Sequence, residues 1–179
     1  METWDAIRAR RNVRSYSDRP LAPDELDRIL EAGRRSPSSR NWQPWDFVVV
    51  TEPDQREAIS KVWQFGAYVA GAQAVVALVG QEQSEEQQRL WQYFDHGQAM
   101  LAMMLAAADL GIGSGHSAIG DQELARSVLG LPADRFCVAL LALGYPADRP
   151  LAPMRRPNRR SFDDVVHRGR WGKGLSPSP

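Results

Sequence analysis

One segment, residues 83–110, limits the fold of this chain more than any other. Its first half carries an apolar face at helical spacing that begins with Leu90, Trp91 and Phe94. From residue 99 to residue 108 the segment is apolar nearly all round, so a helix here must be covered on most of its sides. Because 179 residues are enough for one sizeable domain and few for two, a second copy of the chain is the expected source of part of that cover.

The remaining chain alternates between the two kinds of secondary structure. Valine-rich and other apolar runs predict strands at 46–51, 74–80 and 136–144, and a Gly-rich extended segment follows the long helix at 111–118. Shorter helical patterns with start and stop signals cover residues 4–10, 23–33, 52–69 and 121–130. This mixed order predicts an α+β fold, a sandwich of a sheet and helices.

Composition argues against several classes of function. Lys and Arg number 22 and Asp and Glu also number 22, so the net charge of zero disfavours binding to nucleic acid or to an anionic membrane. Polar residues break every apolar run before the roughly 20 residues that cross a bilayer, and no signal peptide follows Met1. A single cysteine, Cys137, excludes an intramolecular disulfide, so we expect a cytoplasmic protein. The three histidines lie too far apart to form a metal-ligand pattern, and no metal site is predicted.

The connector before the first strand, Ser36–Phe47, is unusually rich in chemistry. It reads Ser-Pro-Ser-Ser-Arg-Asn-Trp-Gln-Pro-Trp-Asp-Phe, so almost every residue is a hydrogen-bonding group or an aromatic. Such a loop is typical of a surface that holds a flat ligand with polar edges. The alternative is ordinary turn and helix-end chemistry for the Ser and Asn residues, and a core position for Trp45 beside the strand, which is the reading we favour for Trp45.

Two arginine clusters predict a site for a phosphate. Arg10, Arg11 and Arg14 follow one another closely at the end of a helix, where the helix dipole alone also favours cations. The second cluster, at 155–160, lies in a tail whose later apolar residues can dock it onto a folded surface: Phe162, Val165, Val166 and Trp171. Together with the loop, the two clusters indicate an aromatic cofactor that carries a phosphate.

Other candidates have simpler interpretations. The glycines of residues 111–120 lack the strand-turn-helix context of a dinucleotide fold, so we expect them to allow close approach of another backbone. Cys137 lies within a predicted strand, where a thiol acts as a small apolar group. The methionines of the long helix are expected in its core face.

The order of these motifs resembles the FMN-dependent nitroreductase family. Besides the Arg-Arg-Asn-Val-Arg run at 10–14 and the loop at 36–47, the chain shares Leu-Gly-Ile-Gly-Ser-Gly at 110–115, Leu-Gly-Tyr-Pro at 143–146 and Asp-Asp-Val-Val-His at 163–167. The resemblance implies a homodimer of three-layer sandwiches, each with a mixed or antiparallel central sheet flanked by helices. It also implies an FMN-binding domain over residues 1–150 and a C-terminal arm over 151–179 that packs on the partner subunit.

Carried over residue by residue, the resemblance implies a full set of FMN contacts. The phosphate end would be held by Arg10, Arg11, Asn12, Arg159 and Arg160. Arg14 would lie by the pyrimidine edge of the ring and stabilise negative charge there. The partner chain would hold the ring and ribityl group through Pro37, Ser38, Ser39 and Asn41. Backbone along the ring would come from His116, Ser117, Ala118 and Ile119, and no side chain need act as acid or base.

The implied function is a ping-pong oxidoreductase that takes electrons from NAD(P)H and passes them through FMN to a nitroaromatic, a quinone or a related small molecule. Compared with larger family members, the segment at 63–74 is short and lacks their lid, and Ala118 and Ile119 replace an acidic residue and a glycine. These departures leave open a specialised flavin enzyme of the same fold, such as an oxidase, a dehalogenase or a flavin-modifying enzyme, with little NAD(P)H reductase activity. A nucleic-acid-binding module that uses the basic tail is the third possibility, and the zero net charge argues against it.

Overall fold

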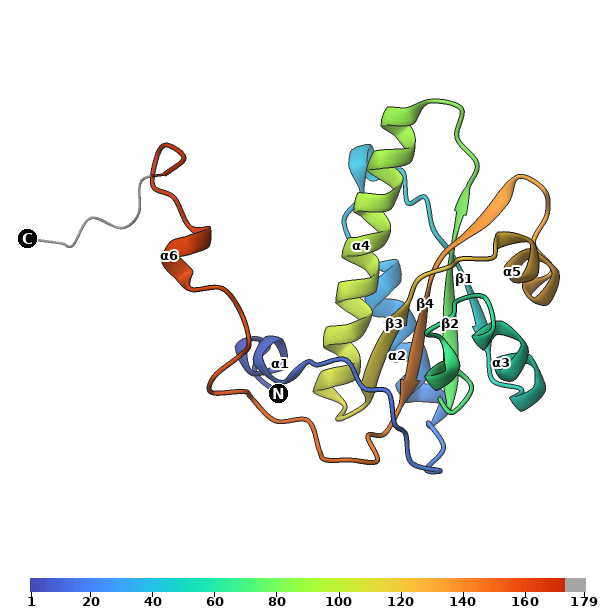
Figure 1. Ribbon diagram of the computed structural model, residues 1–179, viewed down its shortest axis with the longest axis horizontal. Coiled ribbons are helices and arrows are strands. Elements are labelled where there is room, and N and C mark those ends of the chain that lie inside the picture. The colour runs from blue at the N-terminus through green and yellow to red at the C-terminus, as the bar shows by residue number, and fades with distance from the viewer. Residues whose placement is uncertain (173–179) are drawn as a thin grey trace, which may run out of the picture.

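The computed structural model describes residues 1–172, which form one α+β unit followed by an extended arm (Figure 1). The helices are α1 (Thr3–Ala9), α2 (Pro23–Arg34), α3 (Pro53–Ser60), α4 (Glu86–Asp109), α5 (Gln122–Leu129) and α6 (Phe162–Val165), with 3₁₀ turns η1 (Ser39–Asn41) and η2 (Ala67–Val69). The strands are β1 (Asp46–Val50), β2 (Ala74–Gln81), β3 (Gly113–Ser117) and β4 (Arg135–Gly144).

The four strands form a single antiparallel sheet in the order β1-β2-β4-β3. The two long strands β2 and β4 lie at its centre, where Val76 pairs with Leu141. All residues of β2 except the last are buried, as expected for a strand whose sequence is apolar without alternation. This sheet confirms the predicted α+β fold with an antiparallel central sheet.

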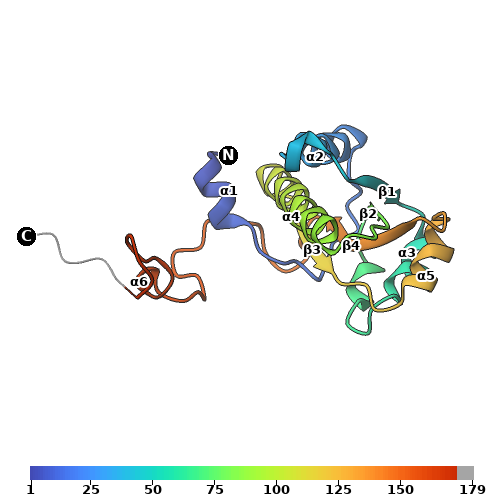
Figure 2. The ribbon, with the colours of Figure 1, turned by 90° about the horizontal axis from the view of Figure 1, so that it is seen from above.

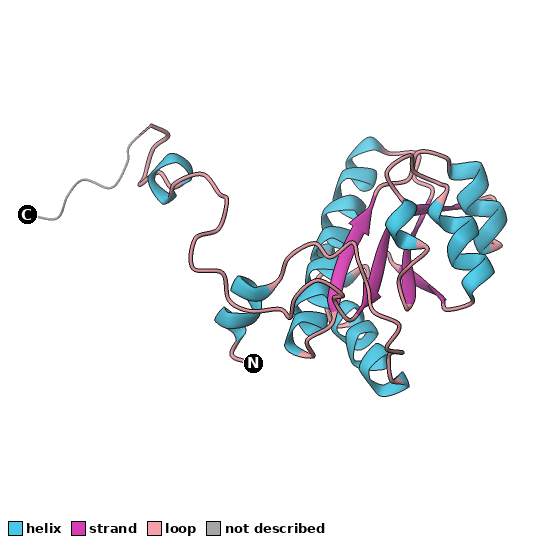
Figure 3. Ribbon diagram, turned by 60° about the horizontal axis from the view of Figure 1, so that its bottom comes forward, coloured by secondary structure: helices cyan, strands magenta, loops and turns pink. Residues whose placement is uncertain are grey.

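Helices cover both faces of the sheet, which gives three layers (Figures 2 and 3). On one face α2 and α4 pack against a core that contains Ile29, Leu78 and Met103. On the other face α3 and α5 pack against a core that contains Ile59 and the buried thiol of Cys137. Burial raises the pKa of that thiol to about 12, so it stays protonated, as expected of a small apolar group.

The prediction of one helix over residues 52–69 was wrong at its C-terminal end. Helix α3 stops at Ser60, and the chain turns before the short η2. The amides of Lys61 and Val62 donate to carbonyl oxygens three residues back, which closes the last turn, and the Val62 carbonyl oxygen accepts from the amides of Gly120 and Asp121. Contacts with the segment before α5 therefore override the local helical pattern.

The chain segment that follows α1 pairs with the edge strand β3. Asn12 forms a parallel bridge with Ser114, and the Val13 amide donates to the Ser114 carbonyl oxygen at 2.9 Å. A Cβ atom added to Gly115 would lie 2.4 Å from the Val13 carbonyl oxygen. The Gly-rich run therefore serves the close backbone approach that its sequence predicts.

The arm leaves the end of β4, runs past α1 and carries α6 away from the sheet and its helices (Figures 1 and 2). The side chains of Phe162, Val165 and Trp171 are exposed, so within residues 1–172 they are not docked on the body of their own chain. The remaining residues of the predicted arm lie outside the described range. Within that range, none of the helices combines the length and the hydropathy needed to cross a membrane.

Candidate functional site

The first candidate site is a pocket of about 440 Å³ beside β3, which we call the Arg14 pocket. It is lined by Arg14, Trp63, Phe65, Tyr68, His116, Ser117 and Ala118. Three segments far apart in sequence meet here: the stretch after α1, the turn after α3, and the end of β3. The pocket thus brings together four residues that the sequence singled out for the flavin ring, namely Arg14, His116, Ser117 and Ala118.

Tyr68 fixes the geometry of the Arg14 pocket. Its hydroxyl donates to the His116 carbonyl oxygen at 2.5 Å, and the Arg14 guanidinium lies 5.7 Å from the centre of its ring. Burial raises the pKa of Tyr68 although nearby Arg14 acts in the opposite direction, so the phenol stays neutral and remains a donor at neutral pH. Tyr68 therefore ties the turn after α3 to the end of β3.

Sequence reasoning missed the three aromatic residues of the Arg14 pocket. Trp63 and Phe65 pack edge to face with ring centroids 5.8 Å apart, and Phe65 is largely exposed. The available signal was three aromatic residues within the six positions 63–68, but the predicted helix over 52–69 would have scattered them around its axis. The turn after Ser60 instead directs all three side chains to one pocket.

A second pocket, of about 380 Å³, is lined by four arginines and lies between α1 and the arm. The arginine pocket, as we name it, contains Arg8, Arg10, Arg155 and Arg159, together with Trp4, Ile7, Met154 and Pro157. The amide of Met154 donates to the Arg8 carbonyl oxygen at 3.1 Å, which holds the arm against α1. Within residues 1–172 no acidic side chain lines this pocket, so its concentrated positive charge suits a dianion.

The other predicted phosphate ligands do not line the arginine pocket. The Arg11 guanidinium pairs with the Asp148 carboxylate at 2.7 Å and donates to the Arg149 carbonyl oxygen, and its hydrogen bond lowers the pKa of Asp148. Asn12 lies in the bridge to β3, and the Arg160 guanidinium donates to the Asp164 carbonyl oxygen. In this structure Arg11 therefore links the start of the chain to the start of the arm. Ile119 packs on the core near α5.

The loop Ser36–Phe47 lies against α4 and is held by a buried carboxylate. Asp95 accepts from the Ser39 amide at 3.0 Å and faces the Ser39 hydroxyl at 3.5 Å. The Ser38 hydroxyl accepts from the Gln43 amide at 2.9 Å, and Arg40, Asn41 and Gln43 all adopt positive φ. Trp45, in contrast, is buried in the core, which confirms the interpretation preferred from the sequence.

Asp95 was not among the predicted residues, because its partner Ser39 lies 56 positions away and one acidic residue among the other polar residues of the helix gives no local pattern. The loop residues Pro37, Ser38, Ser39 and Asn41 line neither the Arg14 pocket nor the arginine pocket. Within the described residues of one chain, the loop is thus separate from both pockets, and Arg11, Asn12, Ile119 and Arg160 lie outside all three.

The sequence of this chain matches a known protein family. The model of the nitroreductase family matches residues 7–67 and 62–145, which include the Arg14 pocket and the loop. A protein of Archaeoglobus fulgidus with the provisional name NADH dehydrogenase/NAD(P)H nitroreductase is 31% identical over 175 residues, covering 95% of this chain and 99% of its own. The FMN reductase [NAD(P)H] of Bacillus subtilis is 28% identical over 176 residues, covering 87% of this chain and 70% of its own.

Solved structures share the same fold. An FMN-dependent nitroreductase from Clostridium difficile superposes with a TM-score of 0.81 at 22% identity, over 93% of this chain and 98% of its own. The family model spans most of the chain, and the sequence relatives cover nearly its full length. The chain belongs to the nitroreductase family.

Proposed function

We propose that this protein is an FMN-dependent oxidoreductase that transfers electrons from NAD(P)H to a small aromatic acceptor, such as a nitroaromatic or a quinone, by a ping-pong mechanism. The observation that carries the proposal is the Arg14 pocket, where the Arg14 guanidinium, a neutral phenol and the end of β3 meet. Relatives named FMN reductase and NAD(P)H nitroreductase support it.

The residues present fit FMN at both of its ends. Arg10 and Arg14 belong to one continuous stretch, so the arginine pocket and the Arg14 pocket are joined by only a few residues, an extended span of about 14 Å at most. Four guanidinium groups in the first pocket match a phosphate dianion, and the aromatic walls of the second match a flat ring.

Each group of this chain has a physical role in that arrangement. FMN, when bound, supplies the hydride chemistry between donor and acceptor. Arg8, Arg10 and Arg159 would hold the phosphate, and Arg14 would present a positive charge to the edge of the ring that becomes negative on reduction. Tyr68 fixes the His116 carbonyl group and so orients the backbone along the ring.

The proposed enzyme works as a homodimer, in which the loop Ser36–Phe47 of each chain completes the site of its partner. In support, the loop is separate from both pockets of its own chain, and the outward face of α4 exposes Leu90, Phe94 and Leu101. Exposed apolar side chains on one face of a helix favour burial against another surface.

The first test is the visible spectrum of the purified protein, recorded anaerobically before and after addition of NADH or NADPH. We expect the absorbance of an oxidised flavin and its loss on mixing with at least one of the two donors. A colourless protein that takes up no FMN would contradict the proposal. Stable FMN binding without bleaching by either donor would favour the specialised flavin enzyme, for which the short turn at Trp63–Phe65 leaves room over the pocket.

The second test is Arg14→Ala. Loss of the fixed cation should slow the bleaching of the flavin by NAD(P)H about 100-fold and weaken FMN binding, while the fold is kept. Arg28→Ala is the matched control, because Arg28 pairs with Asp109 on the surface and lines neither pocket. Equal bleaching rates for the Arg14 and Arg28 variants would show that Arg14 does not stabilise the charge of the reduced ring.

A further inference from the structure

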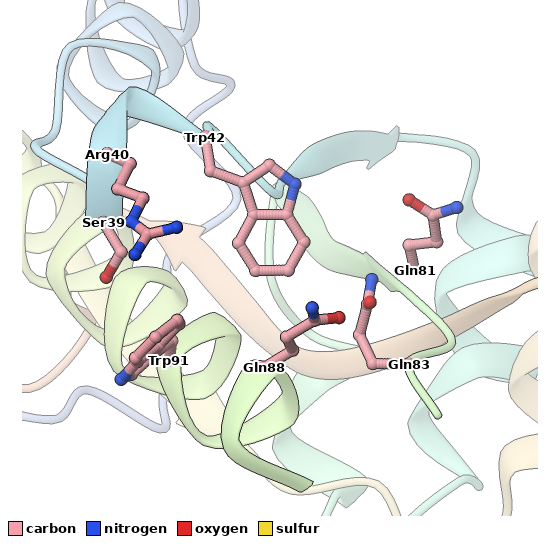
Figure 4. A pocket seen from close by; sticks show the side chains of 7 residues that line it. All are labelled: Ser39, Arg40, Trp42, Gln81, Gln83, Gln88 and Trp91. Atoms are coloured by element: carbon pink, nitrogen blue, oxygen red, sulfur yellow. The ribbon is translucent and has the colours of Figure 1, made fainter. Parts of the chain in front are cut away.

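A third pocket, outside the two already described, lies between the loop and the start of α4. This tryptophan pocket has a volume of about 500 Å³ and is lined by Ser39, Arg40, Trp42, Gln81, Gln83, Gln88 and Trp91 (Figure 4). It draws on the loop, on the end of β2 with the turn after it, and on the first turns of α4. Its volume falls in the range of small-molecule sites.

Two indole rings give the tryptophan pocket its aromatic walls. Trp42 and Trp91 come from separate elements and are 37% and 38% exposed, so each keeps a large apolar surface open to a ligand. In Figure 4 the Trp42 ring lies on one side of the hollow, and Trp91 and Gln88 lie on the other. A flat ring between them would gain apolar burial, while the three glutamine amides can donate or accept at its edges.

The charge in the tryptophan pocket is a single cation. The Arg40 guanidinium lies 6.0 Å from the centre of the Trp91 ring and points into the hollow (Figure 4). In the described part of the chain, no acidic residue lines the pocket and no carboxylate lies within ion-pair distance of Arg40. The fork of the guanidinium is therefore available for a carboxylate, which it binds with two parallel hydrogen bonds.

The backbone that presents Arg40 is strained and firmly held. Arg40 has φ of 53° and Asn41 has φ of 58°, left-handed conformations that cost on the order of 1–2 kcal/mol per residue. The hydrogen bonds of Ser39 to Asp95 and of Gln43 to the Ser38 hydroxyl fix the loop on either side. Strain of this kind persists where the surroundings determine the conformation, so the backbone at Arg40 is set before any ligand arrives.

We propose that the tryptophan pocket binds a planar aromatic ring that carries one carboxylate, with the ring between Trp42 and Trp91 and the carboxylate on Arg40. The inference rests on the proposed function, under which this ligand is the electron acceptor: a nitroaromatic carboxylate. Ser39 lines the pocket and belongs to the loop that is expected to touch the flavin. An acceptor bound in this pocket would therefore lie beside the flavin. Over the full cycle, the hydride of NAD(P)H supplies two electrons and the solvent supplies a proton; one N–O bond of the nitro group breaks, and a nitroso compound, water and NAD(P)⁺ result.

Equilibrium binding tests the pocket without any turnover. Benzoate and benzamide have nearly the same shape and differ in charge, and tryptophan fluorescence of the FMN-loaded protein reports their binding. We expect benzoate to bind at least about tenfold more tightly than benzamide, the size of one charge-assisted contact of about 1.4 kcal/mol. Arg40→Gln should abolish this difference, Arg40→Lys should keep part of it, and Trp91→Leu should weaken both ligands.

Arg89→Gln provides the matched control, because Arg89 lies on the same helix, is exposed, and does not line the pocket. It removes the same charge and should leave the preference for benzoate unchanged. Equal binding of benzoate and benzamide by the unmodified protein would overturn the inference. A preference for benzoate that survives in Arg40→Gln would overturn it as well.

The oxidative half-reaction tests the role as acceptor separately from the donor. The flavin is reduced with dithionite and mixed anaerobically with 4-nitrobenzoate or 4-nitrobenzamide, and the return of its absorbance is followed. Arg40→Gln should lower the second-order rate constant about tenfold for 4-nitrobenzoate and leave that for 4-nitrobenzamide unchanged. A protein that holds no flavin would contradict the proposed function. An equal decrease of the rate constant for both acceptors in Arg40→Gln would contradict only the inference about Arg40.

Discussion

At the scale of single residues, a close backbone contact beside the Arg14 pocket depends on a missing side chain. Gly115 lies in β3 opposite the stretch that ends in Arg14, and an added Cβ would also approach the Tyr16 hydroxyl and the Tyr68 ring to 3.0 Å. Tyr68 lines the Arg14 pocket, and the Tyr16 hydroxyl donates to the Val13 carbonyl oxygen at 2.8 Å. A methyl group at this position must therefore move the backbone that carries Arg14.

Gly115→Ala should consequently lower the free energy of unfolding by about 2–3 kcal/mol, the usual cost of overpacking a rigid contact. Gly71→Ala is the matched control, since its nearest contact is the Tyr68 carbonyl oxygen at an ordinary 3.8 Å, and it should change stability by less than about 0.5 kcal/mol. Urea denaturation of both variants measures the difference. A fully stable Gly115→Ala would show that the stretch at 12–14 can shift freely.

The residues that could be predicted from the sequence are those whose environment follows from their neighbours along the chain. Trp45 and Cys137 lie beside or within apolar strands, so their burial follows from the local sequence pattern. The glycines of β3 predict the close approach of another backbone segment. Tyr68 and Asp95 could not be found this way. Their partners His116 and Ser39 lie 48 and 56 positions away, and only the fold brings them together.

At the scale of elements, α4 is attached to the sheet through a row of buried polar side chains. The Gln92 amide bonds to both backbone groups of Gln81, at 3.1 and 3.0 Å, and the His96 ring lies 3.1 Å from the Val79 carbonyl oxygen. This is where the pairing of β2 with β4 shifts register between Leu78 and Val79. The polar side chains of α4 therefore satisfy backbone groups beside an irregular stretch of sheet.

Asp95 belongs to the same row and faces the loop instead of the sheet. Asp95→Ala should leave the Ser39 amide without its partner, destabilise the loop by about 1–3 kcal/mol, and speed hydrogen exchange over residues 38–43. Asp95→Asn keeps an acceptor oxygen and should have a smaller effect. Exchange measured by mass spectrometry checks both, with residues 74–81 of β2 as the internal reference. Unchanged exchange in Asp95→Ala would mean that other contacts hold the loop.

The element boundaries show what local pattern alone leaves out. Strands β1, β2 and β4 and helices α2, α4 and α5 appear close to where apolar periodicity and helix signals place them. The error in α3 arose because nothing in residues 61–69 interrupts a helical pattern strongly. There the Val62 carbonyl oxygen gains two partners from the segment before α5, and this tertiary gain outweighs local propensity.

At the scale of the whole molecule, the outward face of α4 is an apolar stripe. Leu90, Phe94, Gly97 and Leu101 are exposed and follow one another at steps of four, three and four residues, the spacing of a helix that packs along another. The exposed arm adds further apolar surface, with Trp171 at 90% exposure. We expect a second copy of the chain to cover both surfaces.

Leu101→Glu should therefore shift the protein from dimer to monomer, because a carboxylate at the C-terminal end of the stripe would be buried in the interface. Val49→Glu, an equally drastic change of an exposed apolar residue on the edge strand β1, should leave the assembly intact. Sedimentation velocity at several protein concentrations separates the two outcomes. A dimeric Leu101→Glu, or a protein that is monomeric without mutation, would rule out α4 as the interface.

The two faces of α4 have a thermodynamic consequence. One face carries Asp95 and so sets the position of the loop, and the opposite face carries the stripe. If the loop of one chain completes the cofactor site of the other, FMN binding and subunit association are linked by a coupling free energy, so each one favours the other. Mass action then makes the apparent affinity for FMN rise with protein concentration, and FMN in turn lowers the concentration at which the dimer dissociates.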